Sequence, residues 1–308
     1  ERDSRLALAA YRQSAEVSRS IGSMAEARAL LNFNRLLEKG SANLVASTPE
    51  LRCESLNLSA LLTAKALLSN SSTPADISQK QVILERNRDR ILALLIAEPD
   101  SQDKAYSLIN LANSLMVKDD KGQMQGTVKT TVPNLNPIAL LEQALAVSRK
   151  VGDGRAESFS LGTLGEVYEA ATQYRRAMQY TLDAQLKAQE VGAADSLYRW
   201  QWQMGRILKA TGQRERAITS YEQAIATLQS IRGDIVIANK DLQFDFRDSV
   251  EPVYRQLIGL LLTDEAAAPA KSKQLQTKAT GITDPANVTK VLNILELLKL
   301  AELQNFFG

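Results

Sequence analysis

The chain has 308 residues, of which 44% are hydrophobic and 23% charged, a composition typical of a globular protein rather than a disordered one. Its formal net charge of +2 disfavours nucleic acid or an anionic membrane as a partner. Histidine is absent and Cys53 is the single cysteine, which removes the usual general base and the commonest zinc ligand. We therefore expect no catalytic residue, no metal site and no cofactor. Leu and Ala abound while aromatic residues make up only 5%, which favours helices over sheets.

The first hundred residues predict helices of irregular register. Ala7, Tyr11 and Ser14 are spaced along one helix face, and the segment ALLNFNRLLEKG predicts a second helix. Leu-rich stretches at 48–70 and 79–99 predict further helices, although residues 41–100 follow no regular repeat.

A clearer helix pair follows after residue 100. Residues 105–118 place Leu108, Leu111, Ala112 and Leu115 on one face, and NPIALLEQALAVSRK predicts the partner helix. Between them, residues 118–136 are rich in Gly, Thr and polar side chains, which predicts an inserted loop on the surface.

One helix pair is repeated after forty residues. The stretch LGTLGEVYEAATQYRRAMQYTLDA, residues 161–184, combines bulky and small residues on two consecutive helices. Gly205 follows Gly165 at 205 − 165 = 40, and Ala224 follows Ala184 at 224 − 184 = 40. Glycines just past the expected helix ends predict left-handed helix caps. These are Gly22, Gly152, Gly192 and Gly233.

This pattern resembles the tetratricopeptide repeat (TPR) in a form of about forty residues. The segment LGEVYEAATQYRRAMQYTLDA carries the Leu-Gly-x-x-Tyr and the two Ala residues of that family. The resemblance implies an all-α fold, a right-handed superhelix of antiparallel helix pairs (a TPR-like α-solenoid), over residues 1–232.

The tail contains IRGDIVIANKDLQFDFRDSVEPVYRQLIGLLL and VTKVLNILELLKLAELQNFFG, which predict capping helices over 233–308 with a linker at about 263–286. These segments resemble the closing helices of bacterial, especially cyanobacterial, repeat proteins in which a caspase-like CHAT domain follows. The resemblance implies that the chain is the regulatory or recruitment part of a larger peptidase protein. Its partner would then include a C-terminal domain of the same polypeptide.

In the tetratricopeptide family the first helix of each pair lines a concave groove. The resemblance places the following exposed positions of this sequence in that groove: Asn110, Asn113, Glu166, Glu169, Arg199, Trp202, Arg206 and Lys209. An early copy adds Arg28, Asn32 and Arg35. Asn side chains can hydrogen-bond a peptide backbone, and Arg can bind a carboxylate through two N–H groups. The alternative is an ordinary solvated helix face.

The segment RWQW, residues 199–202, holds both tryptophans. Because residues i and i+2 lie on different sides of a helix, we expect one tryptophan to be packed and the other to be partly exposed. An exposed tryptophan beside Arg199 and Arg206 would be suited to anchor a partner.

These observations predict a non-enzymatic protein- or peptide-binding scaffold, with no nucleic acid and no membrane as partner. The alternatives are a self-association module and an enzyme that uses carboxylates such as Glu166 and Glu169. The N-terminal segment lacks the features of a signal peptide, so we expect the cytoplasm, while a chain beginning without Met also allows a signal removed from a precursor.

Overall fold

The computed structural model describes residues 2–19, 23–39, 74–118, 124–127, 135–231, 250–262 and 285–307. Within these ranges the chain is helical apart from one short hairpin, so the prediction of an all-α class is confirmed. The chain forms two compact units, Glu1–Val191 and Gly192–Gly308, which we name the first and second units. Outside the described residues lie Cys53, the helix predicted at 48–70, Gly22, Gly233 and residues 263–284 of the linker predicted at about 263–286. The last two residues of that linker, Pro285 and Ala286, instead begin a helix.

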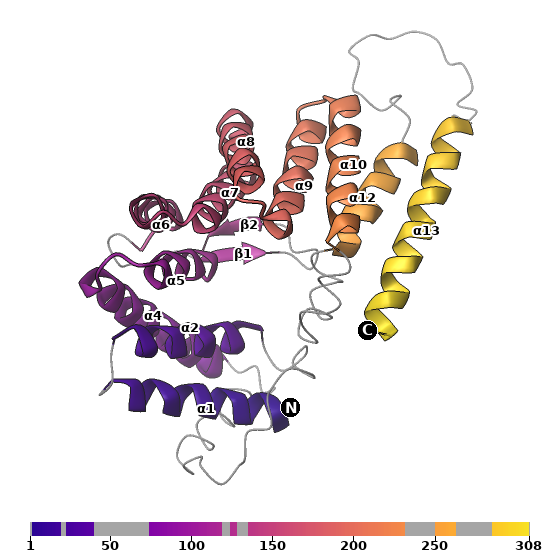
Figure 1. Ribbon diagram of the computed structural model, residues 1–308. Helices are drawn as coiled ribbons and strands as arrows, with labels where there is room; N and C mark the ends of the chain where they lie inside the picture. Colours follow the sequence, from indigo (N-terminus) through magenta and orange to yellow (C-terminus); the bar gives the residue numbers. More distant parts are fainter. Residues whose placement is uncertain are drawn as a thin grey trace, which may run out of the picture. The chain divides into compact units, whose positions relative to one another are not determined.

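In the first unit, helices adjacent in the chain pack against one another (Figure 1). They are α1 (Arg2–Ser18), α2 (Ser23–Lys39), α4 (Pro74–Ala97), α5 (Gln102–Asn113), α6 (Pro137–Val151), α7 (Gly154–Ala170) and α8 (Tyr174–Glu190). Helix α5 also contacts both α2 and α7. Helix α5 therefore packs on helices from both earlier and later parts of the chain.

Three helix starts in this unit are fixed by side-chain caps. Ser101 accepts a hydrogen bond from the backbone N–H of Lys104, and Asp153 accepts one from the backbone N–H of Ala156. Asn136 caps α6 by accepting from the N–H of Ile138, while Pro137 occupies the first helical turn, where no N–H is needed.

The segment predicted as an inserted loop at 118–136 contains a strand. Strands β1 (Met116–Lys118) and β2 (Met124–Thr127) form an antiparallel hairpin with a register shift between Val117 and Lys118, and β2 contacts α7. Strands of three and four residues are too short for an apolar alternation to stand out in the sequence.

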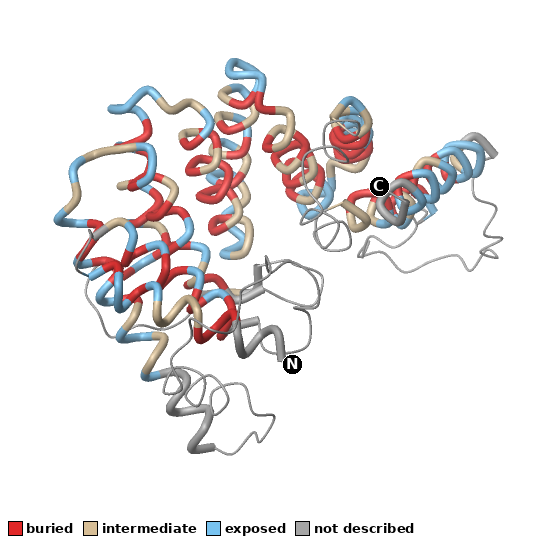
Figure 2. Tube along the Cα trace, turned by 60° about the horizontal axis from the view of Figure 1, so that its bottom comes forward, coloured by how far each residue is buried: buried red, intermediate tan, exposed pale blue. Residues whose placement is uncertain are grey.

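The second unit contains α9 (Ala194–Ala210), α10 (Arg214–Ser230), α12 (Glu251–Leu262) and α13 (Pro285–Phe307). Helix α10 packs on α9 and on α12, and α12 packs on α13 (Figure 1). In both units the buried residues gather on the sides at which neighbouring helices meet (Figure 2).

The forty-residue repeat is confirmed in the helix boundaries of two pairs. Helices α7 and α8 begin and end exactly forty residues before α9 and α10, since 194 − 154 = 40 and 230 − 190 = 40. Small residues at matching positions of the second helices are fully buried in both pairs. They are Ala177 and Ala184 in α8, and Ala217 and Ala224 in α10. The two pairs therefore use alanine at equivalent positions for close helix packing.

Glycine ends three helices in the left-handed conformation. Gly152, Gly192 and Gly212 have φ angles of +73°, +65° and +75°, so the predicted caps at Gly152 and Gly192 are confirmed. Thr172, forty residues before Gly212, has a φ of +57° and is the one non-glycine residue with positive φ among the described residues. A β-branched residue in this region is strained.

Replacing Thr172 with Gly is therefore expected to stabilise the α7–α8 turn by about 0.5–1 kcal/mol. The gain is smaller than the full strain because Gly also increases the entropy of the unfolded chain. Urea denaturation followed by circular dichroism measures the change. The opposite change at the equivalent position of the next pair, Gly212→Thr, should lower the free energy of unfolding. Equal stability of both variants and the parent would contradict the assignment of strain.

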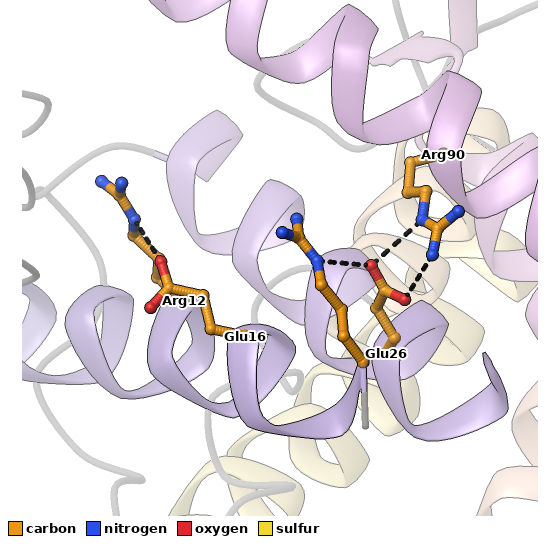
Figure 3. Close-up of polar contacts among 5 residues, drawn as sticks. Arg12, Glu16, Glu26 and Arg90 are labelled. Carbon is orange, nitrogen blue, oxygen red and sulfur yellow. Dashed lines mark hydrogen bonds and ion pairs between the residues drawn. The ribbon is translucent and has the colours of Figure 1, made fainter. Parts of the chain in front are cut away.

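A buried carboxylate joins three helical segments of the first unit (Figure 3). The side chain of Glu26 on α2 is only 1% exposed. It accepts hydrogen bonds from Arg19 Nε at 3.0 Å, Arg90 Nε at 3.1 Å and Arg90 Nη2 at 2.8 Å. The hydrogen bond from Arg90 is the largest influence on the pKa of Glu26, which lies below its usual value although burial acts in the opposite direction. The paired charges thereby hold the end of α1 and helix α4 against α2.

Candidate functional site

The predicted groove residues of the first unit lie on two contacting helices. Asn110 and Asn113 are exposed on α5, and Glu166 and Glu169 are half-buried on α7, one helical turn apart. Helices α5 and α7 contact each other, and each also packs on the helix that follows it in the chain, α6 or α8. Polar side chains thus remain accessible beside the packing positions on both helices.

The groove residues predicted on the earlier helix α2 are also accessible. Arg28, Asn32 and Arg35 on α2 are all exposed, as the resemblance implied. Arg28 forms an ion pair with Asp103 of α5, so this arginine links α2 with α5.

In the second unit, all four predicted groove residues lie on α9. Arg199, Trp202 and Arg206 are half-buried, and Lys209 is exposed. Their spacing of three, four and three residues places them along one side of the helix. Trp200 is only 5% exposed, so the prediction that one tryptophan is packed and the other partly exposed is confirmed.

The structure brings Trp202 and Arg206 together. The Arg206 guanidinium lies over the Trp202 ring, 4.7 Å from the ring centroid. This distance is within the range of a cation–π interaction, which is attractive because the ring face is electron-rich. Arg199 instead lies over the ring of its neighbour Tyr198, at 5.7 Å. The two arginines of α9 are therefore held by different aromatic rings.

Trp202 is also fixed by a hydrogen bond to another helix of the unit. Its indole Nε1–H donates to Gln256 Oε1 on α12 at 2.8 Å, and the hydroxyl of Tyr221 on α10 donates to the same oxygen at 2.9 Å. We call Trp202, Arg206, Gln256 and Tyr221 the Trp202 platform. Its four side chains come from three helices, so a ligand would meet a preformed surface rather than order it on binding.

Glycine at position 205 makes room for this platform. A Cβ at Gly205 would lie 2.8 Å from the Tyr221 ring, closer than real Cβ contacts. The Tyr221 ring therefore rests directly on the α9 backbone, one residue before Arg206. Tyr221 is 1% exposed, and its hydroxyl is the polar end that reaches Gln256.

Sequence reasoning identified Trp202 and Arg206 but missed Gln256. Gln256 lies on α12, a helix outside the forty-residue pattern, and no spacing rule connects it with α9. Tyr221 lies between the small residues Ala217 and Ala224 of α10, a position that indicates packing. Its hydroxyl gave a signal, since a buried tyrosine needs a hydrogen-bond partner.

Neither a metal-binding cluster nor a membrane-spanning helix is found among the described residues. They contain no group of three or more Asp, Glu, Cys or His side chains suited to a metal ion. In the same residues no helix has the length and apolar character needed to span a bilayer. In comparisons with known proteins, no protein-family model matches the sequence and no curated protein is similar to it.

Proposed function

We propose that the chain is a non-enzymatic scaffold that binds a protein or peptide along the first helices of TPR-like helix pairs. The observation that carries the proposal is the Trp202 platform, a rigid aromatic and basic surface on the first helix of a repeated pair. In the other unit, exposed Asn113 on α5 and half-buried Glu166 on α7 also leave polar side chains accessible to a ligand. Such preformed surfaces gain affinity because little side-chain entropy is lost on binding.

In this proposal the helix pairs form a right-handed α-solenoid, and the chain acts as the recruitment or regulatory part of a larger CHAT-type peptidase protein. The matching boundaries of α7–α8 and α9–α10 support this proposal, because a solenoid is built from helix pairs of equal length. The tail resemblance supports the link to a peptidase domain. The C-terminal domain of the same polypeptide would then be a second partner, and the cytoplasm the expected compartment.

Charge reversal at Arg199 and Arg206 tests the binding function. We expect the double variant Arg199→Glu, Arg206→Glu to weaken binding of a partner captured from cell extract by about tenfold or more, since both charges lie on one side of α9. Calorimetry measures the affinity, and circular dichroism verifies that the helices are intact. Unchanged affinity in a folded variant would contradict the assignment, and hydrolysis by the purified chain in a broad substrate screen would favour the enzyme alternative.

A specific observation also favours self-association as a second candidate function. Helix α13 buries Val291, Ile294 and Leu298, yet it also exposes several large apolar side chains. These are Val288, Leu292, Leu295, Leu300 and Leu303, with exposed fractions from 37% to 56%. Exposed apolar surface of this kind can pair with a second copy. Light scattering over a range of concentrations separates the two functions, because self-association increases the mass without any added ligand.

A further inference from the structure

The Trp202 platform presents hydrogen-bond donors. An indole N–H and a phenol O–H both point to Gln256, and because the indole nitrogen can only donate, the atom that faces it must be the amide oxygen. The amide nitrogen of Gln256, with its two N–H groups, therefore lies on the other side of the amide carbon. Arg206 adds a guanidinium that lies over the Trp202 ring at 4.7 Å from the ring centroid, and its N–H groups lie in the plane of the guanidinium.

The preceding repeat does not share the positive charge of this surface. Arg206 and Lys209 occupy the positions at which the preceding repeat has Glu166 and Glu169, since 206 − 166 = 40 and 209 − 169 = 40. The buried residues of the two first helices keep a common pattern, with Gly165 and Gly205 both buried. The two repeats therefore differ in charge at accessible positions while they share their packing.

One acidic residue shares this side of α9. Asp195 precedes Arg206 by eleven residues, which corresponds to about 16 Å along the helix axis. At this separation its charge is largely screened from the C-terminal half of the helix at physiological ionic strength. Among the side chains of α9 itself, the charges around Arg206 and Lys209 are therefore positive.

We propose that the Trp202 platform binds an acidic segment of a partner protein. Arg206 binds an Asp or Glu carboxylate through its N–H groups, Lys209 attracts a second carboxylate, and the Gln256 amide donates to a backbone carbonyl of the segment. Contact with the Trp202 ring limits the side-chain rotamers of Arg206, so Arg206 loses less conformational entropy when it binds a carboxylate. This inference rests on the proposed function and names the chemistry of its partner.

Two matched peptide libraries test the proposal on the full chain. One contains Asp and Glu, and in the other Asn and Gln replace them at every position. We expect the chain to enrich peptides from the acidic library, with an affinity that falls as the salt concentration rises. The variant Lys209→Glu changes an exposed residue and should remain folded, and together with Arg206→Glu it should lower the affinity for these peptides by on the order of tenfold or more.

The double variant Arg175→Glu with Arg216→Glu reverses two exposed charges on the second helices α8 and α10, so it is the matched control and should leave the affinity within about twofold of the parent. Equal enrichment from both libraries would overturn the acidic preference while leaving peptide binding intact. Acidic peptides that bind equally well to the Lys209→Glu and Arg206→Glu variants would overturn the site. Binding of neither library would contradict the inference and also count against the proposed function.

Discussion

Replacing Gly205 with Val is expected to lower the free energy of unfolding of the second unit by about 2–4 kcal/mol. The new side chain would occupy the space that the Tyr221 ring fills, because even a Cβ at this position would lie 2.8 Å from that ring. Displacing Tyr221 would also remove its hydrogen bond to Gln256, which fixes Trp202. The substitution therefore acts on packing and on the Trp202 platform together.

Tryptophan fluorescence during urea denaturation measures this effect, because both tryptophans of the chain lie on α9 and report on the second unit. Gly259 on α12 supplies the control, since a Cβ there would meet nothing within 4 Å. The variant Gly259→Ala should be stabilised by about 0.5–1 kcal/mol through its helix propensity. A Gly205→Val chain as stable as the parent would show that Tyr221 does not pack tightly on α9.

Replacing Glu26 with Gln is expected to destabilise the first unit by about 2–4 kcal/mol near neutral pH. The carboxylate is buried and paired with Arg19 and Arg90, and an amide cannot balance these two charges. We place the loss below that of a fully buried ion pair because the side chains of the two arginines are 61% and 48% exposed. Hydrogen exchange of the α2 amides, measured by mass spectrometry, reports the local free energy of opening.

The effect of Glu26→Gln should depend on pH. Pairing lowers the pKa of Glu26 in the folded chain below its ordinary value of 4.5, so the carboxylate contributes its full stabilisation above about pH 4.5. This contribution is lost as the pH falls through the folded-state pKa. The stability difference between parent and variant should therefore shrink in acid, and a difference that is independent of pH would contradict the role of the charge.

Glu16 is the matched control for Glu26 (Figure 3). It forms an ion pair with Arg12 at 3.3 Å across one turn of α1, and both side chains are substantially exposed. Solvent and salt screen such a pair, so Glu16→Gln should change stability by no more than about 0.5 kcal/mol.

Features that depend on neighbours along the chain could be predicted from the sequence. The caps at Gly152 and Gly192 and the forty-residue spacing of Gly165 and Gly205 follow from helix periodicity and from glycine's access to positive φ. The same periodicity placed Trp202 and Arg206 on one side of a helix, where they contact each other.

Features that depend on the packing between distant segments could not be predicted. Gln256 meets Trp202 across 54 residues, and Arg90 meets Glu26 across 64, and no sequence spacing encodes such contacts. Glu26 was missed for a second reason, because a glutamate in a helical pattern is ordinarily interpreted as solvated. The hairpin of β1 and β2 was missed because its strands are too short to show a period.

Hydroxyl-radical footprinting of the chain, with and without a captured peptide, tests most directly where the binding surface lies. We expect the peptide to protect the half-buried Trp202 on the first helix α9. Leu182 and Leu186, which are 44% and 56% exposed on the second helix α8, should keep their reactivity. Protection of these two leucines with Trp202 unchanged would contradict binding along the first helices.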